Sequence, residues 1–335
     1  MIKIEKNISL APYTTFRLGG RAKYFCRITS LDDLSEALVF AKEKKVPVFI
    51  LGGGSNILLL DSGFSGLVLK NDIKGTKIIK ENSKETIVMV GSGETWGIFG
   101  GFCLRHKLYG LENLLYVPGT VGGAVIGNIG AYGVTQEDYF VSLQALDLKK
   151  GEVLTFTKND CKFAYRYSLL KDKKNRGRYF VLSVDYRLFK KFIPRLSYNS
   201  LKEVVPKKPN INDLLKAIAL IRGATLPSLD VFYSAGSFFK NPEIKSSKLK
   251  DLLKKFPDLK HFGSKISAGW LIEIAGFKGF SYKNAYVSPK HALVLGNNGQ
   301  AKSQDIIHLK DLIQEAVWRK FGILLEPEII IVDQG

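Results

Sequence analysis

The sequence contains few cysteines and no long hydrophobic run. Its three cysteines, Cys26, Cys103 and Cys161, are widely separated and form no CxxC pair, so they indicate neither a disulfide framework nor a zinc site. No apolar stretch approaches the roughly 18 residues that a membrane-spanning helix needs, and the first ten residues lack a signal-peptide core. We therefore expect a cytoplasmic protein without membrane insertion, whose cysteines are small buried hydrophobic residues.

Acidic residues are also scarce. The 335-residue chain has 50 Lys and Arg against 31 Asp and Glu, which gives a net charge of +19 at pH 7. Such a charge would attract nucleic acid, an anionic membrane surface or phosphate-bearing small molecules. The basic residues are mostly dispersed, and no aromatic-interleaved pattern typical of nucleic-acid binding accompanies them. We interpret most of the charge as a solvated basic surface and expect no nucleic-acid partner.

The apolar pattern predicts alternating strands and helices in a globular chain long enough for two or three domains. Residues 22–28 form a predicted strand, and Ser30 can cap the helix that follows. A second strand, residues 46–51, ends directly in Gly52-Gly53-Gly54-Ser55-Asn56. A glycine-rich turn at the C-terminal end of a buried strand is a favoured place for a ligand.

The rest of the chain predicts a second lobe of short strands and a third unit near the C-terminus. The predicted strands are 86–90, 179–188, 292–295 and 328–333; the predicted helices are 96–106, 212–222 and 303–321. Residues 171–178 form a predicted mobile surface loop.

A second glycine-rich segment, Pro118–Gly133, carries no charged side chain. Glycine is kept where positive φ or close approach to a ligand is needed, so exposed N–H groups here could hold a pyrophosphate and an apolar wall could accept a flavin ring. Neither glycine segment is a Rossmann fingerprint, because Trp96 takes the third glycine position after Gly91-Ser92-Gly93, and no Walker motif occurs. Either segment alone is typical of a tight turn; two together indicate a cofactor.

Several motifs occur in the order found in one enzyme family and together span about residues 13–332. They are Tyr13–Gly20, Gly52–Asn56, Pro118–Gly133, Tyr165–Ser168, Ala235–Pro242 and Leu325–Glu328. In these segments the chain resembles the UDP-N-acetylenolpyruvoylglucosamine reductase (MurB) family. Leu196-Ser197-Tyr198 resembles the tyrosine-bearing loop of the family's longer subclass.

The resemblance implies an α+β fold with a split FAD-binding region of the vanillyl-alcohol-oxidase/PCMH type and a smaller α/β substrate domain. Residues 1–70 would form the first FAD-binding subdomain, with a C-terminal strand, 322–335, returning to it. Residues 71–225 would form the second subdomain, and 226–321 the substrate-binding domain.

The activity that the resemblance implies is NADPH-dependent, FAD-mediated reduction of UDP-N-acetylglucosamine enolpyruvate to UDP-N-acetylmuramate. This reaction belongs to peptidoglycan precursor synthesis, and hence to cell wall growth, cell shape and division. The implied enzyme is a cytoplasmic monomer with bound FAD and NADPH as co-substrate.

The resemblance also implies three catalytic residues. Arg166 would stabilise the negative charge that spreads onto the substrate carboxylate, since its planar fork can hold a carboxylate in a bidentate pair. Ser237 matches the proton donor, and Glu328 could help to stabilise the enol. Without the family motifs, the same residues are typical of a surface ion pair, a turn serine and a solvent-facing carboxylate.

Further positions carry over as binding residues. The cofactor-binding positions are Gly52, Gly53, Gly54, Ser55, Asn56, Pro118, Gly119, Thr120, Gly122, Gly123, Asn128, Gly130 and Ala131. The substrate-binding positions are Tyr198, Arg222, Asn241, Lys278 and His291. His291 stands where some relatives carry a glutamine, and Thr225 where relatives of this subclass carry a lysine, so another lysine substitutes or phosphate binding is weaker.

No metal is expected, because the remaining histidines lack the spacing and the acidic partners of a metal site. Three other hypotheses remain. Another FAD oxidase or dehydrogenase of the same fold would share the glycine segments but lack the joint catalytic set. A basic nucleic-acid-binding protein would explain the charge but not Pro118–Gly133, and Thr225 would fit a degenerate, inactive flavoprotein.

Overall fold

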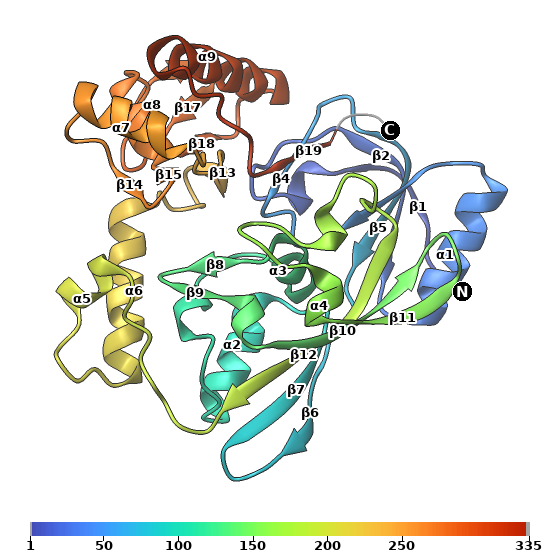
Figure 1. The fold of residues 1–335 in the computed structure, drawn as a ribbon. Coiled ribbons are helices and arrows are strands. Elements are labelled where there is room, and N and C mark those ends of the chain that lie inside the picture. Colours follow the sequence, from blue (N-terminus) through green and yellow to red (C-terminus); the bar gives the residue numbers. More distant parts are fainter. Residues whose placement is uncertain (1, 333–335) are drawn as a thin grey trace. The chain divides into compact units, whose positions relative to one another are not determined.

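The computed structural model describes residues 2–332 and divides into two compact units (Figure 1). Unit 1 consists of Met1–Ile8, Ala22–Gly53 and Ser65–Arg222; unit 2 consists of Ser9–Arg21, Gly54–Phe64 and Gly223–Gly335. The chain therefore passes from one unit to the other several times before it enters the C-terminal part of unit 2.

The first sheet of unit 1 has the strand order β1-β2-β5-β3. Its strands are β1 (Glu5–Ser9), β2 (Arg21–Ile28), β5 (Phe64–Asn71) and β3 (Val48–Leu51), of which β3 and β5 run parallel. Helix α1 (Leu31–Glu43) begins at Ser30, whose hydroxyl accepts the N–H of Asp33 at 3.1 Å while the Asp33 carboxylate accepts the Ser30 N–H. This capping box satisfies two backbone donors and fixes the predicted start of the helix.

The second sheet of unit 1 is antiparallel, with the order β11-β10-β12-β7-β6. Its strands are β11 (Glu152–Thr157), β10 (Phe140–Asp147), β12 (Tyr179–Phe189), β7 (Glu85–Gly91) and β6 (Thr76–Glu81). Helices α2 (Trp96–Arg105), α3 (Val121–Gly127) and α4 (Lys158–Cys161) share its core, in which Trp96 and Phe99 pack edge to face at 5.8 Å. Val121, Ala124 and Val125 of α3 belong to the same core, so this helix is buried on one side within it.

Short elements complete unit 1. They are the hairpin β8 (Gly130–Ala131) and β9 (Val134–Thr135), the 3-10 helices η2 (Glu112–Leu114), η3 (Gln136–Asp138) and η4 (Leu169–Lys171), and helices α5 (Asn199–Val204) and α6 (Ile211–Thr225). Leu201 of α5 and Leu214 and Ile218 of α6 form a small core of their own, against which Tyr132 packs.

Unit 2 contains a four-stranded sheet covered by helices. The sheet order is β13 (Tyr233–Ser237), β18 (Val294–Asn297), β17 (Ala285–Val287) and β16 (Ser281–Tyr282). The helices are α7 (Ser246–Lys255), α8 (Ala268–Ile274) and α9 (Ser303–Phe321), and the remaining elements are η1 (Ala11–Tyr13), the hairpin β14 (His261–Phe262) and β15 (Lys265–Ile266), and the parallel pair β4 (Ile57–Leu59) and β19 (Ile330–Val332). Phe16 and Leu58 belong to the same core as α9, so N-terminal and C-terminal segments of the chain fold together.

Most predicted elements are confirmed, with small shifts of their ends. One feature differs from the prediction: a helix, α3, lies within the glycine-rich segment. The predicted surface loop 171–178 ends at Arg178, whose Nη2 lies 2.6 Å from a carboxylate oxygen of the fully buried Asp147. The predicted strand 328–333 begins only at Ile330, and residues 333–335 of the predicted returning strand lie outside the described residues.

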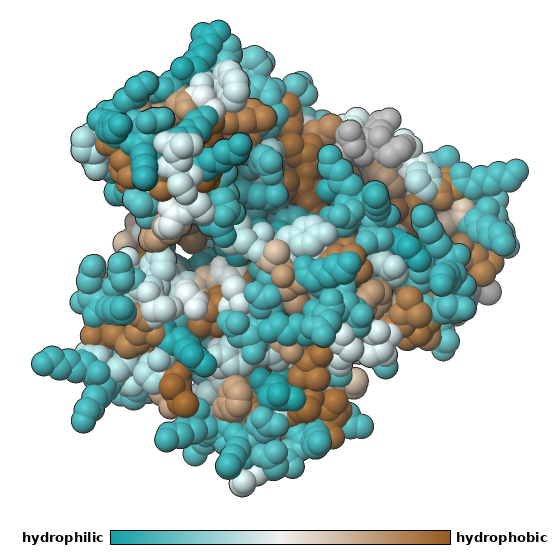
Figure 2. Space-filling model, viewed as in Figure 1, coloured by the Kyte–Doolittle hydropathy of each residue, from teal (hydrophilic) through white to brown (hydrophobic). Residues whose placement is uncertain are grey.

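The surface and the cysteines match the composition. The face drawn in Figure 2 is covered largely by hydrophilic residues, with hydrophobic ones in small separate groups. Cys26, Cys103 and Cys161 are buried free thiols. Within residues 2–332, no helix combines the length and the apolar character that a bilayer crossing requires.

Candidate functional site

The two glycine-rich segments meet in unit 1. A Cβ on Gly53 would lie 2.7 Å from the Gly119 Cα, and a Cβ on Gly52 would lie 3.0 Å from the Thr120 Oγ1. Any side chain at Gly53 would therefore separate the two backbones. The turn after β3 and the start of the Pro118–Gly133 segment form one continuous surface.

Helix α3 uses its first backbone donors within the protein. The N–H of Val121 donates to the Glu94 carbonyl at 2.9 Å, that of Gly122 to the Ser92 carbonyl at 2.8 Å, and that of Gly123 to the Thr120 hydroxyl at 3.4 Å. Sequence reasoning expected the N–H groups of this segment to be available for phosphate. These three are not available, because the glycines here serve helix packing.

The outer side of α3 nevertheless fits a flat ring. A Cβ on Gly127 would meet nothing within 4 Å, and one on Gly123 would meet only the Thr120 hydroxyl at 3.5 Å. These two glycines are one helical turn apart and so lie on the same side of the helix. They leave an open strip without side chains, which is the kind of surface that a flavin ring requires.

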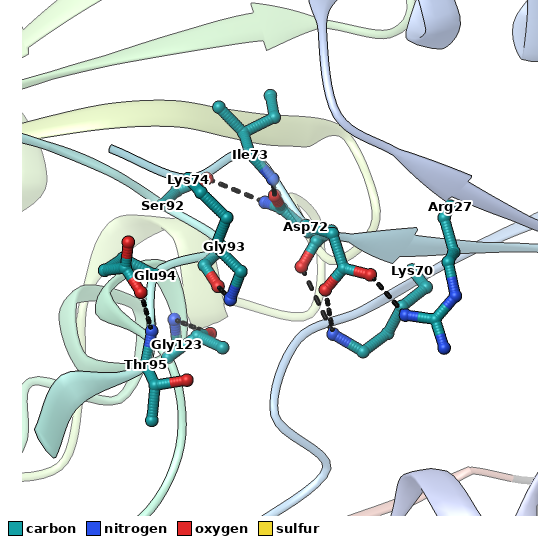
Figure 3. Close-up of polar contacts among 12 residues, drawn as sticks. Arg27, Lys70, Asp72, Ile73, Lys74, Ser92, Gly93, Glu94, Thr95 and Gly123 are labelled. Atoms are coloured by element: carbon teal, nitrogen blue, oxygen red, sulfur yellow. Dashed lines mark hydrogen bonds and ion pairs between the residues drawn. The ribbon is translucent and has the colours of Figure 1, made fainter. Parts of the chain in front are cut away.

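A charged cluster of Arg27, Lys70 and Asp72 lies at the end of β5 (Figure 3). Leu51 of β3 is aligned with Lys70 of β5 in the parallel ladder, so the turn and the cluster share one edge of the sheet. Arg27 Nη1 lies 2.6 Å and Lys70 Nζ 2.9 Å from the Asp72 carboxylate. Two cations on one carboxylate leave a positive excess, which suits an anionic ligand at this edge.

The surroundings of Asp72 favour its ionised form. Burial acts to raise the pKa of Asp72, but the hydrogen bonds and charges of Lys70 and Arg27 outweigh it, and the pKa lies below its usual value. Sequence reasoning missed this cluster. Its only signal is the position of Lys70 and Asp72 at the end of a strand that was not predicted.

Arg166 is held against the Pro118–Gly133 segment. Its turn is closed by two backbone hydrogen bonds between Ala164 and Tyr167, and Arg166 itself has a φ of +55°. Its Nη1 donates to the Gly130 carbonyl at 2.8 Å. The guanidinium is therefore directed toward the glycine-rich segment by a turn of fixed shape.

A buried relay braces this turn from the other side. The Asn128 Nδ2 donates to the Ala164 carbonyl at 2.9 Å, the Gln136 Nε2 donates to the Asn128 Oδ1 at 3.1 Å, and the Tyr186 hydroxyl donates to the Gln136 Oε1 at 3.2 Å. Asn128 is only 2% exposed, and both ends of its side-chain amide are used within the protein.

Ser237 and Glu328 lie on neighbouring segments of unit 2. Ser237 is the last residue of β13 and follows Gly236, whose φ of +71° belongs to a register shift between Ser234 and Ser237. The next residue, Phe238, accepts the N–H of Glu328 on its carbonyl at 2.8 Å. Bulges of this kind re-aim a side chain next to active sites. Ser237 and Glu328 therefore lie on paired backbone segments of unit 2, whereas Arg166 belongs to unit 1.

Two expected substrate-binding residues of unit 1 meet at Tyr132. The rings of Tyr132 and Tyr198 are edge to face, with centroids 5.5 Å apart. Burial raises the pKa of Tyr132, while Arg222, which lies at its hydroxyl, acts to lower it. Tyr132 was not expected from the sequence, although it directly follows the Ala131 position.

The other three expected substrate-binding residues surround α8 in unit 2. Asn241 accepts the Ala268 N–H at 2.9 Å, Lys278 forms an ion pair with Glu273 at 2.8 Å, and the His291 Nδ1 accepts the Leu293 N–H at 3.1 Å. That bond leaves the second ring nitrogen as the donor.

The electrostatic surroundings of His291 favour its neutral form. Burial is the main cause that lowers its pKa, and the nearby positive charge of Lys278 lowers it further.

The structure also places Lys290 Nζ 3.0 Å from the Gly223 carbonyl, two residues from Thr225, where the resemblance expected a lysine.

Comparisons with known proteins match most of the chain. The model of the FAD-binding domain matches residues 22–157, and that of the C-terminal domain of UDP-N-acetylenolpyruvoylglucosamine reductase matches residues 227–332. The curated reductase of Pseudomonas aeruginosa is 38% identical over 98% of both chains, and that of Flavobacterium johnsoniae is 37% identical over 99% of this chain and all of its own.

A solved structure shows the same fold. The crystal structure of the reductase from Thermus caldophilus matches 99% of this chain and all of its own with a TM-score of 0.69, at 24% identity. The predicted α+β fold with a FAD-binding region is confirmed, and FAD is the cofactor. No group of three or more His, Cys, Asp or Glu side chains that could hold a metal ion occurs within residues 2–332. The near full-length identity to the curated reductases shows that the chain belongs to the UDP-N-acetylenolpyruvoylglucosamine reductase family.

Proposed function

We propose that this chain reduces UDP-N-acetylglucosamine enolpyruvate to UDP-N-acetylmuramate, with bound FAD and with NADPH as reductant, in peptidoglycan precursor synthesis. Its family membership and its FAD-binding domain support the reaction type. The observation that carries the proposal is the hydrogen bond from Glu328 N–H to the Phe238 carbonyl, because it pairs the segment of Glu328 with that of Ser237 within the region matched by the reductase C-terminal domain.

The chemistry divides among three residues. When bound, FAD supplies to one alkene carbon the hydride that it receives from NADPH. Arg166 holds the substrate carboxylate and stabilises the negative charge that spreads onto it, and Ser237 gives a proton to the other alkene carbon. A serine hydroxyl is a weak acid and needs a polar neighbour before it can donate a proton. Glu328 supplies a hydrogen bond to the enol.

The cofactor is held by the surface that the two glycine segments form. The Gly52 turn and the open side of α3 fit the ring and the phosphates of FAD, and the cations Arg27 and Lys70 add positive charge at the same sheet edge. In this proposal residues 1–70 with 322–335, and residues 71–225, form the FAD-binding region, and residues 226–321 supply most contacts to the sugar nucleotide.

The sugar nucleotide is bound by polar side chains. The proposed contacts are Tyr198, Arg222, Asn241, Lys278 and His291, the cations among them suiting the diphosphate. Lys290 supplies the charge that Thr225 lacks, since it lies at the adjacent Gly223 carbonyl. We also propose that the enzyme is a cytoplasmic monomer. Its three free thiols fit a reducing compartment. Light scattering should give a single species with the mass of one chain.

Anaerobic stopped-flow spectroscopy tests the proposal. The flavin band should bleach with NADPH and recover only when the enolpyruvyl substrate is added. The Ser237→Ala variant should bleach at the normal rate but recover on the order of a hundredfold more slowly, since general acids of this kind contribute about that much or more. A protein that bleaches and ignores this substrate is a different flavin oxidoreductase, and one that turns over nothing is a degenerate flavoprotein.

A further inference from the structure

Asn113 links two segments that lie far apart in the sequence. It belongs to η2, and only 1% of it is exposed. Its Nδ2 donates to the Tyr132 carbonyl at 2.8 Å and to the Arg195 carbonyl at 3.0 Å. One amide group thus joins the end of the glycine-rich segment to the start of the loop that carries Tyr198.

These two hydrogen bonds require the NH₂ end of the Asn113 side chain. Both partners are carbonyl oxygens, so only the NH₂ end of the amide can satisfy them. The Asn113 Oδ1 is buried and accepts no hydrogen bond within residues 2–332. A buried acceptor without a donor costs free energy, so the two bonds made by Nδ2 carry the whole benefit of this side chain. An aspartate of the same size would place acceptors against acceptors.

The joined segments carry residues of the proposed substrate site. Beside the Asn113 bond, Gly133 has a φ of +81°, and a Cβ there would lie 2.0 Å from the Ser197 Oγ. The Tyr198 ring follows directly and packs on Tyr132. The loop is also held by Leu196, which packs against the small core of α5 and α6, and by a long hydrogen bond of 3.5 Å from the Ser197 Oγ to the Gly133 carbonyl. The two shorter Asn113 bonds therefore reinforce contacts made by half-buried or exposed residues.

We infer that Asn113 is a positioning residue, which orders the loop 195–198 before the sugar nucleotide binds. Asn113 acts through Tyr198, so its contribution is the loop entropy that substrate binding no longer has to remove. The inference rests on the proposed function only for the identity of the ligand; the order of the loop is a property of the flavin-loaded protein alone.

Hydrogen exchange measures that order directly. In the FAD-loaded protein without substrate, Asn113→Asp should increase amide exchange in residues 195–199 by about tenfold or more, while the strands of the second sheet keep their protection. Asn175→Asp is the matched control, because its Nδ2 likewise donates to a backbone carbonyl, that of Leu169, at 3.0 Å. It should leave exchange in the loop unchanged. Unchanged exchange in Asn113→Asp would overturn the inference.

Kinetics then separate positioning from general damage. Asn113→Asp should raise the KM for the enolpyruvyl substrate roughly tenfold and leave kcat within about twofold, since it removes ordering and no reacting group. In a Tyr198→Ala background the same change should have little further effect on KM. A full effect in that background, or a loss confined to kcat, would refute the role assigned to Asn113.

If Asn113→Asp prevents folding, a second variant still tests the inference. Asn113→Ser retains one donor, which can satisfy one carbonyl at most, and should give an intermediate increase in loop exchange. Wild-type exchange in that variant would contradict the inference. Should the protein bind FAD but fail to turn over the substrate, the proposed function fails, while the exchange experiment still decides the role of Asn113.

Discussion

At the scale of a single residue, protonation of His291 makes the stability of the protein depend on pH. Its Nδ1 accepts the Leu293 N–H, and burial with the nearby Lys278 lowers its pKa below the usual value. Protonation would replace that acceptor with a donor. An imidazole of this kind must be neutral for the fold to keep the bond.

The sign of the pH dependence follows. The unfolded histidine has a pKa of about 6.5, so above that pH neither state is protonated and the full stability is present. As the pH falls through that value, the unfolded state takes up a proton first and stability is lost, until the lower folded pKa is passed. His291→Gln should remove this part of the loss, which urea unfolding at pH 5 and pH 8 would show. An equal loss in both proteins would argue against it.

Sequence reasoning works at the residue scale when a motif is local. The Gly52 turn and the Ser237 and Glu328 segments were all expected, since each is read within a few neighbouring residues. Asn113 was not predicted as a site residue, and Asn128 was expected at the cofactor rather than bonded to Ala164, because the partners of both are carbonyls more than 15 positions away. No pattern in the sequence marks which carbonyl a buried amide will meet.

At the scale of elements, the turn around Arg166 depends on η3 and β12. Gln136 transmits the support of Tyr186 to Asn128, which holds the Ala164 carbonyl. Gln136→Leu keeps a similar volume but removes both bonds, so the turn should loosen and kcat should fall by roughly tenfold, as misplaced catalytic groups are costly.

Steady-state kinetics at matched FAD content would measure this effect. Ser142→Ala is a suitable control, because it deletes one side-chain bond to Asp185 in the same sheet. It should leave kcat unchanged. Either of two results for Gln136→Leu would show that the Gln136 relay does not govern Arg166. One is a normal kcat, and the other is a KM that falls together with kcat.

The pairing of Arg178 with Asp147 predicts an acid-sensitive contribution from the same sheet. Hydrogen bonds from Arg178 are the main reason that the pKa of Asp147 is lowered to about 2, against about 3.9 in the unfolded chain. The stabilisation is therefore present above pH 4 and is lost as the pH falls toward 2. Asp147→Asn should lower Tm by several degrees at pH 7 and by little at pH 2, as calorimetry can test; a pH-independent difference would contradict the assignment.

Element prediction failed where packing overrides local preference. Glycine disfavours helices, so the sequence from Val121 to Gly127 predicts a turn. The helix forms because Val121 and Val125 are fully buried in the second core and the Thr120 hydroxyl caps the first turn. Strand β5 was missed too, and with it the cluster of Lys70 and Asp72.

At the scale of the whole molecule, the net charge of +19 predicts salt-sensitive substrate capture. A UDP-sugar carries negative charge, and a strongly basic protein raises its local concentration at low ionic strength. Raising the salt from about 20 mM to 500 mM should increase the KM several-fold and leave kcat nearly constant, since the Debye length falls from about 20 Å to about 4 Å. A KM that ignores salt would mean that the charge serves something other than this ligand.

The split composition of unit 2 also bears on how the chain is made. Asn297 donates to the Phe16 carbonyl, the Asp61 and Ser303 segments exchange hydrogen bonds, and β4 has β19 as its partner. During translation the early segments 9–21 and 54–64 are made 242 to 281 residues before these hydrogen-bond partners exist. All residues of unit 1 have been synthesised by Arg222, so the nascent chain can fold that unit first. Segments 9–21 and 54–64 of unit 2 remain without their partners until α9 and β19 have been made.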